Sequence, residues 1–279
     1  MLLIPGSGPT DRNGNQTGLK TDLLKDLAEK LASKGIATLR FDKRAVATVY
    51  MARYPKAVAD LNDFFSWEAF SGDAAAAFKF LQSQPEVDPK KVGILGHSEG
   101  GLIALDVAQT VHPDALVLGS TAGRDLGTVI IEQIHQGFGA QFTDAAKLKK
   151  FTDETTKAVN AVRTTGQVPT GLSPEIAPLF PAYASKYLHS MFTLDPAKLG
   201  ALYKGPGLVV QGDKDIQISP TADTPLLMGA LPKGTDLYMI PNGTHVWRQW
   251  ISKTEPGFSG KPITAAFDKV AEWCAVNLK

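Results

Sequence analysis

Cysteine is nearly missing from this sequence, since Cys274 is the only one among its 279 residues. A single cysteine excludes an internal disulfide framework and a cysteine-based zinc cluster. Neither sign of charge is in excess: 29 Lys and Arg residues face 28 Asp and Glu residues, so no net field attracts nucleic acid or an acidic membrane. No apolar run approaches the roughly 18 residues that span a bilayer. These absences predict a soluble enzyme or small-molecule binder with neither a nucleic-acid nor a membrane partner.

The amino terminus also lacks the features of a targeting segment. Residues Met1–Gly6 form an apolar segment that runs directly into a turn. They have neither the basic start nor the apolar stretch of about 7–15 residues that defines a signal peptide. A cytoplasmic protein is therefore predicted, with an export signal lost upstream of Met1 as the alternative. The chain is expected to begin inside a sheet.

Short apolar segments alternate with amphipathic ones along the chain. Segments that are short and mostly apolar are typical of parallel strands covered on both faces. After the first segment, the predicted strands are 36–41, 92–95, 115–118, 208–210 and 237–240, and the predicted helices are 21–34, 66–82, 100–110 and 262–277. This alternation predicts an α/β fold with a mostly parallel sheet of about six strands, flanked by helices and joined by right-handed crossovers.

The alternation breaks once, between Arg124 and Tyr203, where the periodicity is helical throughout. We interpret 124–203 as a helical cap inserted between two parts of one core, 1–123 and 204–279. An ordinary surface excursion is the alternative. The cap's aromatic and apolar side chains are predicted to form a substrate pocket, with plain packing as the alternative. These residues are Phe180, Tyr183, Tyr187, Met191 and Phe192.

The segment Gly96-His97-Ser98-Glu99-Gly100 follows a predicted strand and precedes a predicted helix. In this context Gly-x-Ser-x-Gly is typical of a nucleophile elbow, a strained turn that needs small residues on either side of the serine. Ser98 is the predicted nucleophile, and the backbone N–H of Glu99 is predicted to bind an oxyanion. His97 is expected to pack or hydrogen-bond locally. A plain tight turn, in which Ser98 only caps the helix, is the alternative.

A serine nucleophile needs a base and an acid. Of the five histidines, only His245 follows the last predicted strand and comes after the serine in the chain, so it is the predicted base. The loop after 208–210 offers two carboxylates. Asp215 is the predicted acid because it lies beyond the turn, whereas Asp213 is expected to brace the turn itself. The order Ser98, Asp215, His245 is the triad order expected for such a sheet.

Together these segments resemble the α/β-hydrolase superfamily, and within it the bacterial serine esterases of the dienelactone-hydrolase-like and acyl-peptide-hydrolase-like kind. The matching segments are 5–9 with Asp11-Arg12, 40–44, the elbow, Gly212-x-x-Asp215 and His245. The resemblance implies hydrolysis of small to medium carboxylic esters through an acyl-enzyme, without metal or cofactor. Peptidase or thioesterase action by the same triad is the alternative, followed by a non-catalytic binding protein of the same fold.

The resemblance also implies a role for the glycines near the amino end. They do not form a phosphate-binding loop, since Gly6-x-Gly8 is followed by Asp11 where a dinucleotide fingerprint needs glycine. The same position in an α/β-hydrolase supplies the second oxyanion donor. We assign that donor to the N–H of Ser7, with Gly8 as the fallback, while Gly6 and Gly8 let the backbone approach the substrate.

Two departures from the family pattern stand out. Relatives follow the Arg-Phe-Asp-x-Arg stretch with glycine, where this chain has Ala45. Relatives also carry two strands before the one that starts here at Met1. Without them the strand 36–41 becomes an edge, and an exposed edge can pair with another chain. This predicts a homodimer through that edge.

Overall fold

The computed structural model describes residues 1–44, 46, 60–139, 144–255 and 257–278. The chain folds into two compact units. The first, which we call the core unit, comprises Met1–Thr48, Phe70–Gly123 and Pro196–Lys279. The second, the helical unit, comprises Val49–Ala69 and Arg124–Asp195. Ala45, where the sequence departs from its relatives, lies outside the described residues.

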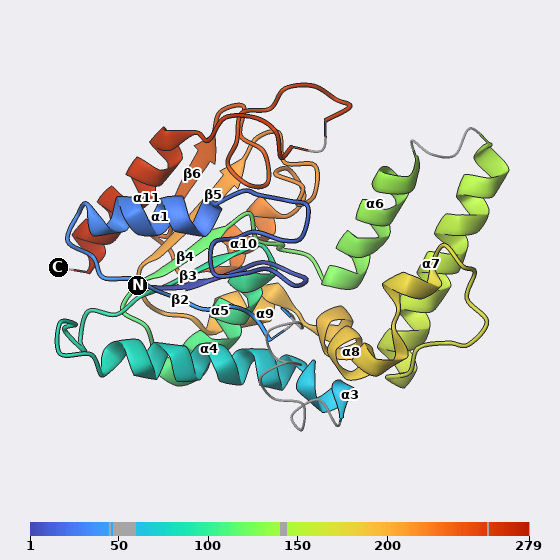
Figure 1. The fold of residues 1–279 in the computed structure, drawn as a ribbon, viewed down its shortest axis with the longest axis horizontal. Helices are drawn as coiled ribbons and strands as arrows, with labels where there is room; N and C mark the ends of the chain where they lie inside the picture. The colour runs from blue at the N-terminus through green and yellow to red at the C-terminus, as the bar shows by residue number, and fades with distance from the viewer. Residues whose placement is uncertain (45, 47–59, 140–143, 256, 279) are drawn as a thin grey trace. The chain divides into compact units, whose positions relative to one another are not determined.

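The core unit is built on a parallel sheet (Figure 1). Within the described residues the sheet has six strands in the order β2-β1-β3-β4-β5-β6, and every neighbouring pair is parallel. The strands are β1 (Leu2–Ile4), β2 (Leu39–Arg40), β3 (Ile94–His97), β4 (Leu116–Gly119), β5 (Gly207–Gly212) and β6 (Asp236–Ile240). The predicted α/β class with a mostly parallel sheet is confirmed.

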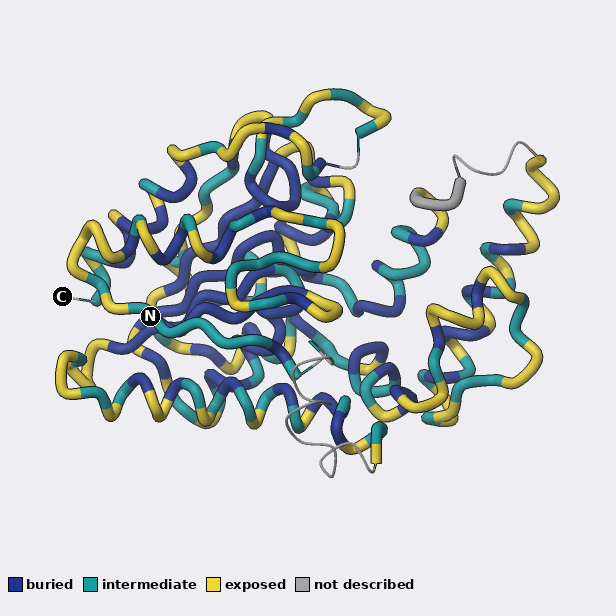
Figure 2. The backbone as a smooth tube through the Cα atoms, viewed as in Figure 1, coloured by how far each residue is buried: buried dark blue, intermediate teal, exposed yellow. Residues whose placement is uncertain are grey.

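Helices cover both faces of this sheet, which is why its central strands are buried and mostly apolar. Helices α1 (Leu23–Ala32) and α11 (Thr264–Asn277) lie together on one face, and α4 (Trp67–Gln82) and α5 (Glu99–Val111) on the other (Figure 1). Leu3, Leu95, Val117 and Val210 join the hydrophobic cluster under α1 and α11. The residues that alternate with them point to the other face, and Figure 2 shows the central strands as a buried layer.

The edge strand β2 is shorter than the predicted 36–41. It pairs with β1 only through Leu39 and Arg40. The backbone groups before β2 have other hydrogen-bond partners. The N–H of Ile36 donates to the Leu31 carbonyl at the end of α1, and the Ala37 carbonyl accepts from the Met1 amine. A homodimer through this edge stays a prediction.

The helical unit has its own packing. Its elements are α3 (Leu61–Phe64), α6 (Leu126–Gly139), α7 (Ala145–Thr165), η2 (Ala177–Leu179), η3 (Ala182–Ala184) and α8 (Ser185–Thr193). Helix α7 contacts α6 and α8, and α3 contacts α8. Phe151, Val159 and Val162 are buried on α7 and form an apolar stripe along it.

The boundary of this unit differs from the predicted end at Tyr203. Helix α9 (Pro196–Leu202) contacts α5 and α10 (Thr224–Ala230), so it belongs to the core unit. Residues 60–69 belong to the helical unit although they lie far from 124–195 in sequence, and the Lys186–Asp63 ion pair is one link between the two segments. Among the described residues, no helix is both long enough and apolar enough to cross a membrane.

Candidate active site

The turn between β3 and α5 holds Ser98 in a strained conformation. Its φ of 56° and ψ of −122° are rare for a residue with a side chain, and its N–H donates to the Gly119 carbonyl at 2.8 Å. The turn is so tight that a Cβ at Gly96 would collide with the Gly100 carbonyl, and one at Gly100 with the Ile4 carbonyl. This is the geometry of a nucleophile elbow, and it explains why small residues flank the serine.

Two loops at the carboxyl edge of the sheet bring His245 and Asp215 together. Asp215 follows β5 and His245 follows β6, and the Nδ1–H of His245 donates to Oδ2 of Asp215 at 2.8 Å. Both side chains are buried, whereas Asp213, two residues before Asp215, is exposed. The backbone N–H groups of Gln217 and Ile218 donate to the other oxygen of Asp215, which fixes the carboxylate plane.

Opposing effects act on the Asp215 carboxyl. Burial raises its pKa, but the charge and hydrogen bond of His245, the Ile218 N–H and the Gln211 amide together hold the pKa below its usual value. The carboxylate is therefore ionised at neutral pH. An ionised carboxylate on Nδ1 fixes the tautomer in which His245 presents Nε2 as a proton acceptor.

His97, next to the serine, hydrogen-bonds to the loop that carries His245. Its Nε2–H donates to the His245 carbonyl at 2.9 Å, and the Ser120 hydroxyl donates to the same oxygen at 2.9 Å. The Trp247 indole N–H in turn donates to the Ser120 oxygen at 3.2 Å. Burial, together with nearby His245, lowers the pKa of His97 to about 3, so His97 is neutral. His97 thus makes a local hydrogen bond, as predicted, and its acceptor is the backbone carbonyl of the predicted base, His245.

The loop after β1 lies against the serine. A Cβ at Gly6 would lie 3.3 Å from the Ser98 Cβ, so the absence of a side chain lets the backbone approach the turn. The Ser7 carbonyl accepts from the Thr10 hydroxyl at 2.7 Å and from the Gln16 amide at 3.0 Å, which fixes the loop. Across the turn, Glu99 is the first residue of α5, where a backbone N–H has no intrahelical acceptor.

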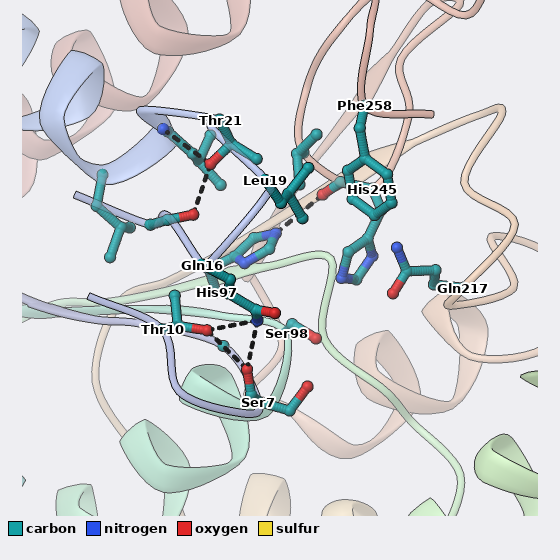
Figure 3. Close-up of a pocket in the computed structure, with 15 residues that line it drawn as sticks. Ser7, Thr10, Gln16, Leu19, Thr21, His97, Ser98, Gln217, His245 and Phe258 are labelled. Carbon is teal, nitrogen blue, oxygen red and sulfur yellow. Dashed lines mark hydrogen bonds between the residues drawn. The ribbon is translucent and has the colours of Figure 1, made fainter. Parts of the chain in front are cut away.

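A cavity of about 230 Å³ opens over Ser98 and His245 (Figure 3). All of its lining residues belong to the core unit. They are Gly6, Ser7, Thr10, Gly14, Gln16, Leu19, Thr21, Leu23, Leu24, His97, Ser98, Gln217, His245, Val246 and Phe258. Gly8, predicted to bind substrate, is absent from this lining, and a Cβ there would lie 3.3 Å from the Gln16 amide nitrogen.

The predicted substrate-binding residues of the cap are also absent from this lining. Phe180, Met191 and Phe192 are buried inside the helical unit, where the rings of Phe180 and Phe192 lie 6.2 Å apart. A substrate role for these three residues stays a prediction. Tyr183 is exposed beside Phe65, with ring centroids 5.8 Å apart, and Tyr187 is half-buried. A substrate role for these two tyrosines stays a prediction.

Several residues at the site were missed by sequence reasoning. Gln217 and Phe258 line the cavity, and Ser120 and Trp247 support the His245 carbonyl. None of the four belongs to a recognisable sequence motif. Ser120, however, follows the predicted strand 115–118, and its position at the carboxyl end of a strand could have indicated a place near the site. The described residues contain no cluster of three or more His, Cys, Asp or Glu side chains arranged to hold a metal.

Two family models match parts of the sequence. The model of the dienelactone hydrolase family matches residues 14–122, and that of the BAAT / acyl-CoA thioester hydrolase C terminal matches residues 75–173. Esterase EstD of Thermotoga maritima is 25% identical over 219 residues. That match covers 78% of this chain and 47% of EstD, so the chain spans about half the length of this curated relative.

Solved structures share the fold over nearly the whole chain. Est1E from Butyrivibrio proteoclasticus is 16% identical with a TM-score of 0.55, covering 99% of this chain and 84% of its own. A thermophilic esterase from Thermogutta terrifontis is 16% identical with a TM-score of 0.56, covering 100% and 90%. With the family models, these matches confirm the resemblance to esterases with the α/β-hydrolase fold.

Proposed function

We propose, from the premise that the chain has the α/β-hydrolase fold, that it is a serine carboxylesterase acting through an acyl-enzyme. The observation that carries the proposal is the buried 2.8 Å hydrogen bond between Asp215 and His245, beside a serine held in a strained turn. All three side chains come from loops at one edge of the sheet, and two of them, Ser98 and His245, line one cavity. The matching families, EstD and Est1E support hydrolysis of an acyl bond.

In this proposal Ser98 Oγ attacks the ester carbonyl while His245 Nε2 takes its proton. His245 then donates that proton to the leaving alcohol. Water then attacks the acyl-enzyme with His245 again as the base, and His245 returns the proton to Ser98 Oγ as the bond to the acyl group breaks and the carboxylic acid leaves. Asp215 stabilises the imidazolium at each step. The backbone N–H groups of Ser7 and Glu99 would hold the oxyanion, because they flank the serine on opposite sides of the turn.

The cavity supports a small substrate. Its volume of about 230 Å³ and its walls of Leu19, Val246 and Phe258 suit a short acyl chain, while the amides of Gln16 and Gln217 suit polar atoms. Rates with p-nitrophenyl esters are expected to peak at acetate to butyrate and to fall towards laurate. A rate that rises steadily to laurate would contradict this size limit.

The central test is Ser98→Ala. Without the nucleophile, kcat for p-nitrophenyl acetate should fall by roughly 10⁴-fold or more, while the melting temperature stays close to that of wild type. A fluorophosphonate probe should label the wild-type protein and spare Ser98→Ala. Ser83→Ala, an exposed serine beyond α4, is the matched control and should keep both activity and labelling. Undiminished turnover by Ser98→Ala contradicts the proposal, and an unlabelled wild type would favour a non-catalytic binding protein.

A thioesterase is the second candidate, because the BAAT / acyl-CoA thioester hydrolase model spans the elbow. The cavity favours the ester: the described residues that line it include neither Lys nor Arg to meet the phosphates of coenzyme A. Parallel assays on p-nitrophenyl butyrate and butyryl-CoA separate the two. A higher kcat/KM for butyryl-CoA would establish the thioesterase in place of the carboxylesterase.

A further inference from the structure

Three consecutive charged residues follow β2, and the mechanism above uses none of them. Asp42 accepts from the backbone N–H, Nε and Nη2 of Arg12 at 2.8, 3.1 and 2.6 Å, in the loop that carries Ser7. Arg44 donates from Nε and Nη2 to Asp73 of α4 at 2.6 and 2.5 Å. These two bidentate pairs fix the backbone on both sides of Lys43.

Lys43 itself is buried, unlike most lysines. Its side chain is 2% exposed, as is that of its partner Glu99, and Nζ lies 2.5 Å from Oε1 of Glu99. The ammonium also donates to the Gly6 carbonyl at 3.1 Å and lies 4.7 Å from the centre of the Phe70 ring. Two hydrogen bonds and a cation–π contact thus surround one charge.

The two hydrogen-bond partners of Lys43 are joined covalently to the two proposed oxyanion donors. The Gly6 carbonyl and the Ser7 N–H form one peptide unit, which is planar and trans, so the two groups point in opposite directions. The hydrogen bond from Lys43 fixes the Gly6 carbonyl and therefore also the direction of the Ser7 N–H. A cation on the carbonyl also polarises the peptide and strengthens its N–H as a donor. Glu99 carries the second donor on its own backbone.

We propose that Lys43 is a positioning residue of the oxyanion hole. Its ammonium group holds the Gly6–Ser7 peptide against Glu99, so that both backbone N–H groups face the ester oxygen as it becomes negative. The inference rests on the proposed esterase function. This role differs from a purely structural one because Lys43 stabilises the transition state and does not affect binding of the substrate in its ground state.

Two variants separate the roles. Lys43→Met removes the ammonium partner of the buried Glu99 carboxylate, so it should lower both stability and kcat. In K43M/E99M both charges give way to apolar chains of similar size, a replacement that is often neutral or stabilising. We expect the double variant to recover the wild-type melting temperature but not its activity, because the Gly6 carbonyl still lacks its cation.

The measurements are kcat, KM and the inhibition constant of a trifluoromethyl ketone, whose hemiketal oxygen occupies the oxyanion hole. For K43M/E99M, kcat should fall about 10- to 100-fold, somewhat less than for outright loss of a donor. KM should change less than about threefold, and the ketone should bind more weakly by the same factor as the loss in kcat/KM. The control Lys30→Met, which breaks the surface pair of Lys30 with Asp268, should change none of these values.

Wild-type kcat and ketone affinity in a stable K43M/E99M would overturn the inference, and so would a loss confined to KM. If that variant fails to fold, Lys43→Gln, one atom shorter and uncharged, carries the same expectations and the same refutation. The Ser98→Ala result keeps the two proposals apart. Activity retained by Ser98→Ala removes both, whereas its loss together with a fully active K43M/E99M removes only the role of Lys43.

Discussion

Asp213 and Asp215 are two residues apart in one loop, yet only Asp215 is buried and hydrogen-bonded to His245. Asp215→Asn keeps the shape but loses the charge that stabilises the imidazolium and the acceptor that fixes its tautomer. We expect kcat for p-nitrophenyl acetate to fall by about 10³- to 10⁴-fold. Asp213→Asn, the matched control, should stay within about twofold of wild type. A larger loss for Asp213→Asn would reassign the acid.

The buried imidazole of His97 donates a hydrogen bond to the backbone carbonyl of His245. His97→Phe removes the donor and leaves that carbonyl with Ser120. One hydrogen bond is worth about 1 kcal/mol, so kcat should fall about fivefold with KM little changed. In His97→Gln the amide nitrogen can replace Nε2, and the loss should be smaller. Equal losses in the two variants would mean that the ring, and not its hydrogen bond, positions His245.

Residues differed in how readily the sequence revealed them. The motif around Ser98 lies within five consecutive residues, so local rules found it. Asp215 and His245 were inferred from strand order, and the structure brings them within hydrogen-bond distance. Lys43 could not be found in this way. Its partner Glu99 is 56 residues away, and a lysine between an aspartate and an arginine suggests a solvated surface.

At the scale of elements, the end of β4 meets the loop that follows β6. Trp247 in that loop is fully buried, has a positive φ of 57°, and lies so close to β4 that a Cβ at Gly119 would be 2.7 Å from its ring. Gly119→Ala should force the ring away and move His245 with it. We expect a loss of about 1–3 kcal/mol in the free energy of unfolding and a lower kcat.

The matched control for that substitution is Gly72→Ala in α4, where a Cβ would meet nothing within 4 Å. Replacing an unhindered helical glycine by alanine should stabilise by about 0.5–1 kcal/mol. Urea unfolding and p-nitrophenyl acetate turnover measure both variants. If Gly119→Ala behaved like Gly72→Ala, Trp247 would be free to move and would not anchor the loop.

Element type was easier to predict than element limits. Helix 66–82 was predicted across Gly72 and is α4, because Phe70, Ala74, Phe78 and Leu81 keep the helical spacing on its buried side. The assignment of α9 to the cap failed because its seven residues have a helical pattern whichever unit they pack on. The choice is made by contacts with α5 and α10, which no local pattern encodes.

At the scale of the whole molecule, the parallel sheet explains why distant segments meet. All strands end at the same edge, so the loops after β1, β3, β5 and β6 bring Ser7, Ser98, Asp215 and His245 to one place. Strand order, with the motif around Ser98, therefore predicted that these loops meet. The support of the site did not follow from strand order, since it depends on side chains such as His97, whose burial beside His245 places a hydrogen-bond donor on the His245 carbonyl.

That burial makes the stability of the protein depend on pH. The pKa of His97 is lowered to about 3 in the folded protein, chiefly by burial, whereas an unfolded histidine titrates near about 6.5. Below about pH 6.5, His97 binds a proton in the unfolded chain but stays neutral in the folded protein. The stability from this group is therefore fully present above pH 6.5 and declines as pH falls towards 3, by up to about 1.4 kcal/mol per pH unit.

Removing the imidazole should flatten this dependence. His97→Gln has no group to titrate, so its free energy of unfolding, measured in urea between pH 6 and 4, should fall less steeply than that of wild type. His97→Phe should show the same shallower slope although it lacks the hydrogen bond to His245, because the effect comes from the proton and not from the bond. A wild-type slope in both variants would mean that the folded protein protonates His97 as readily as the unfolded chain does.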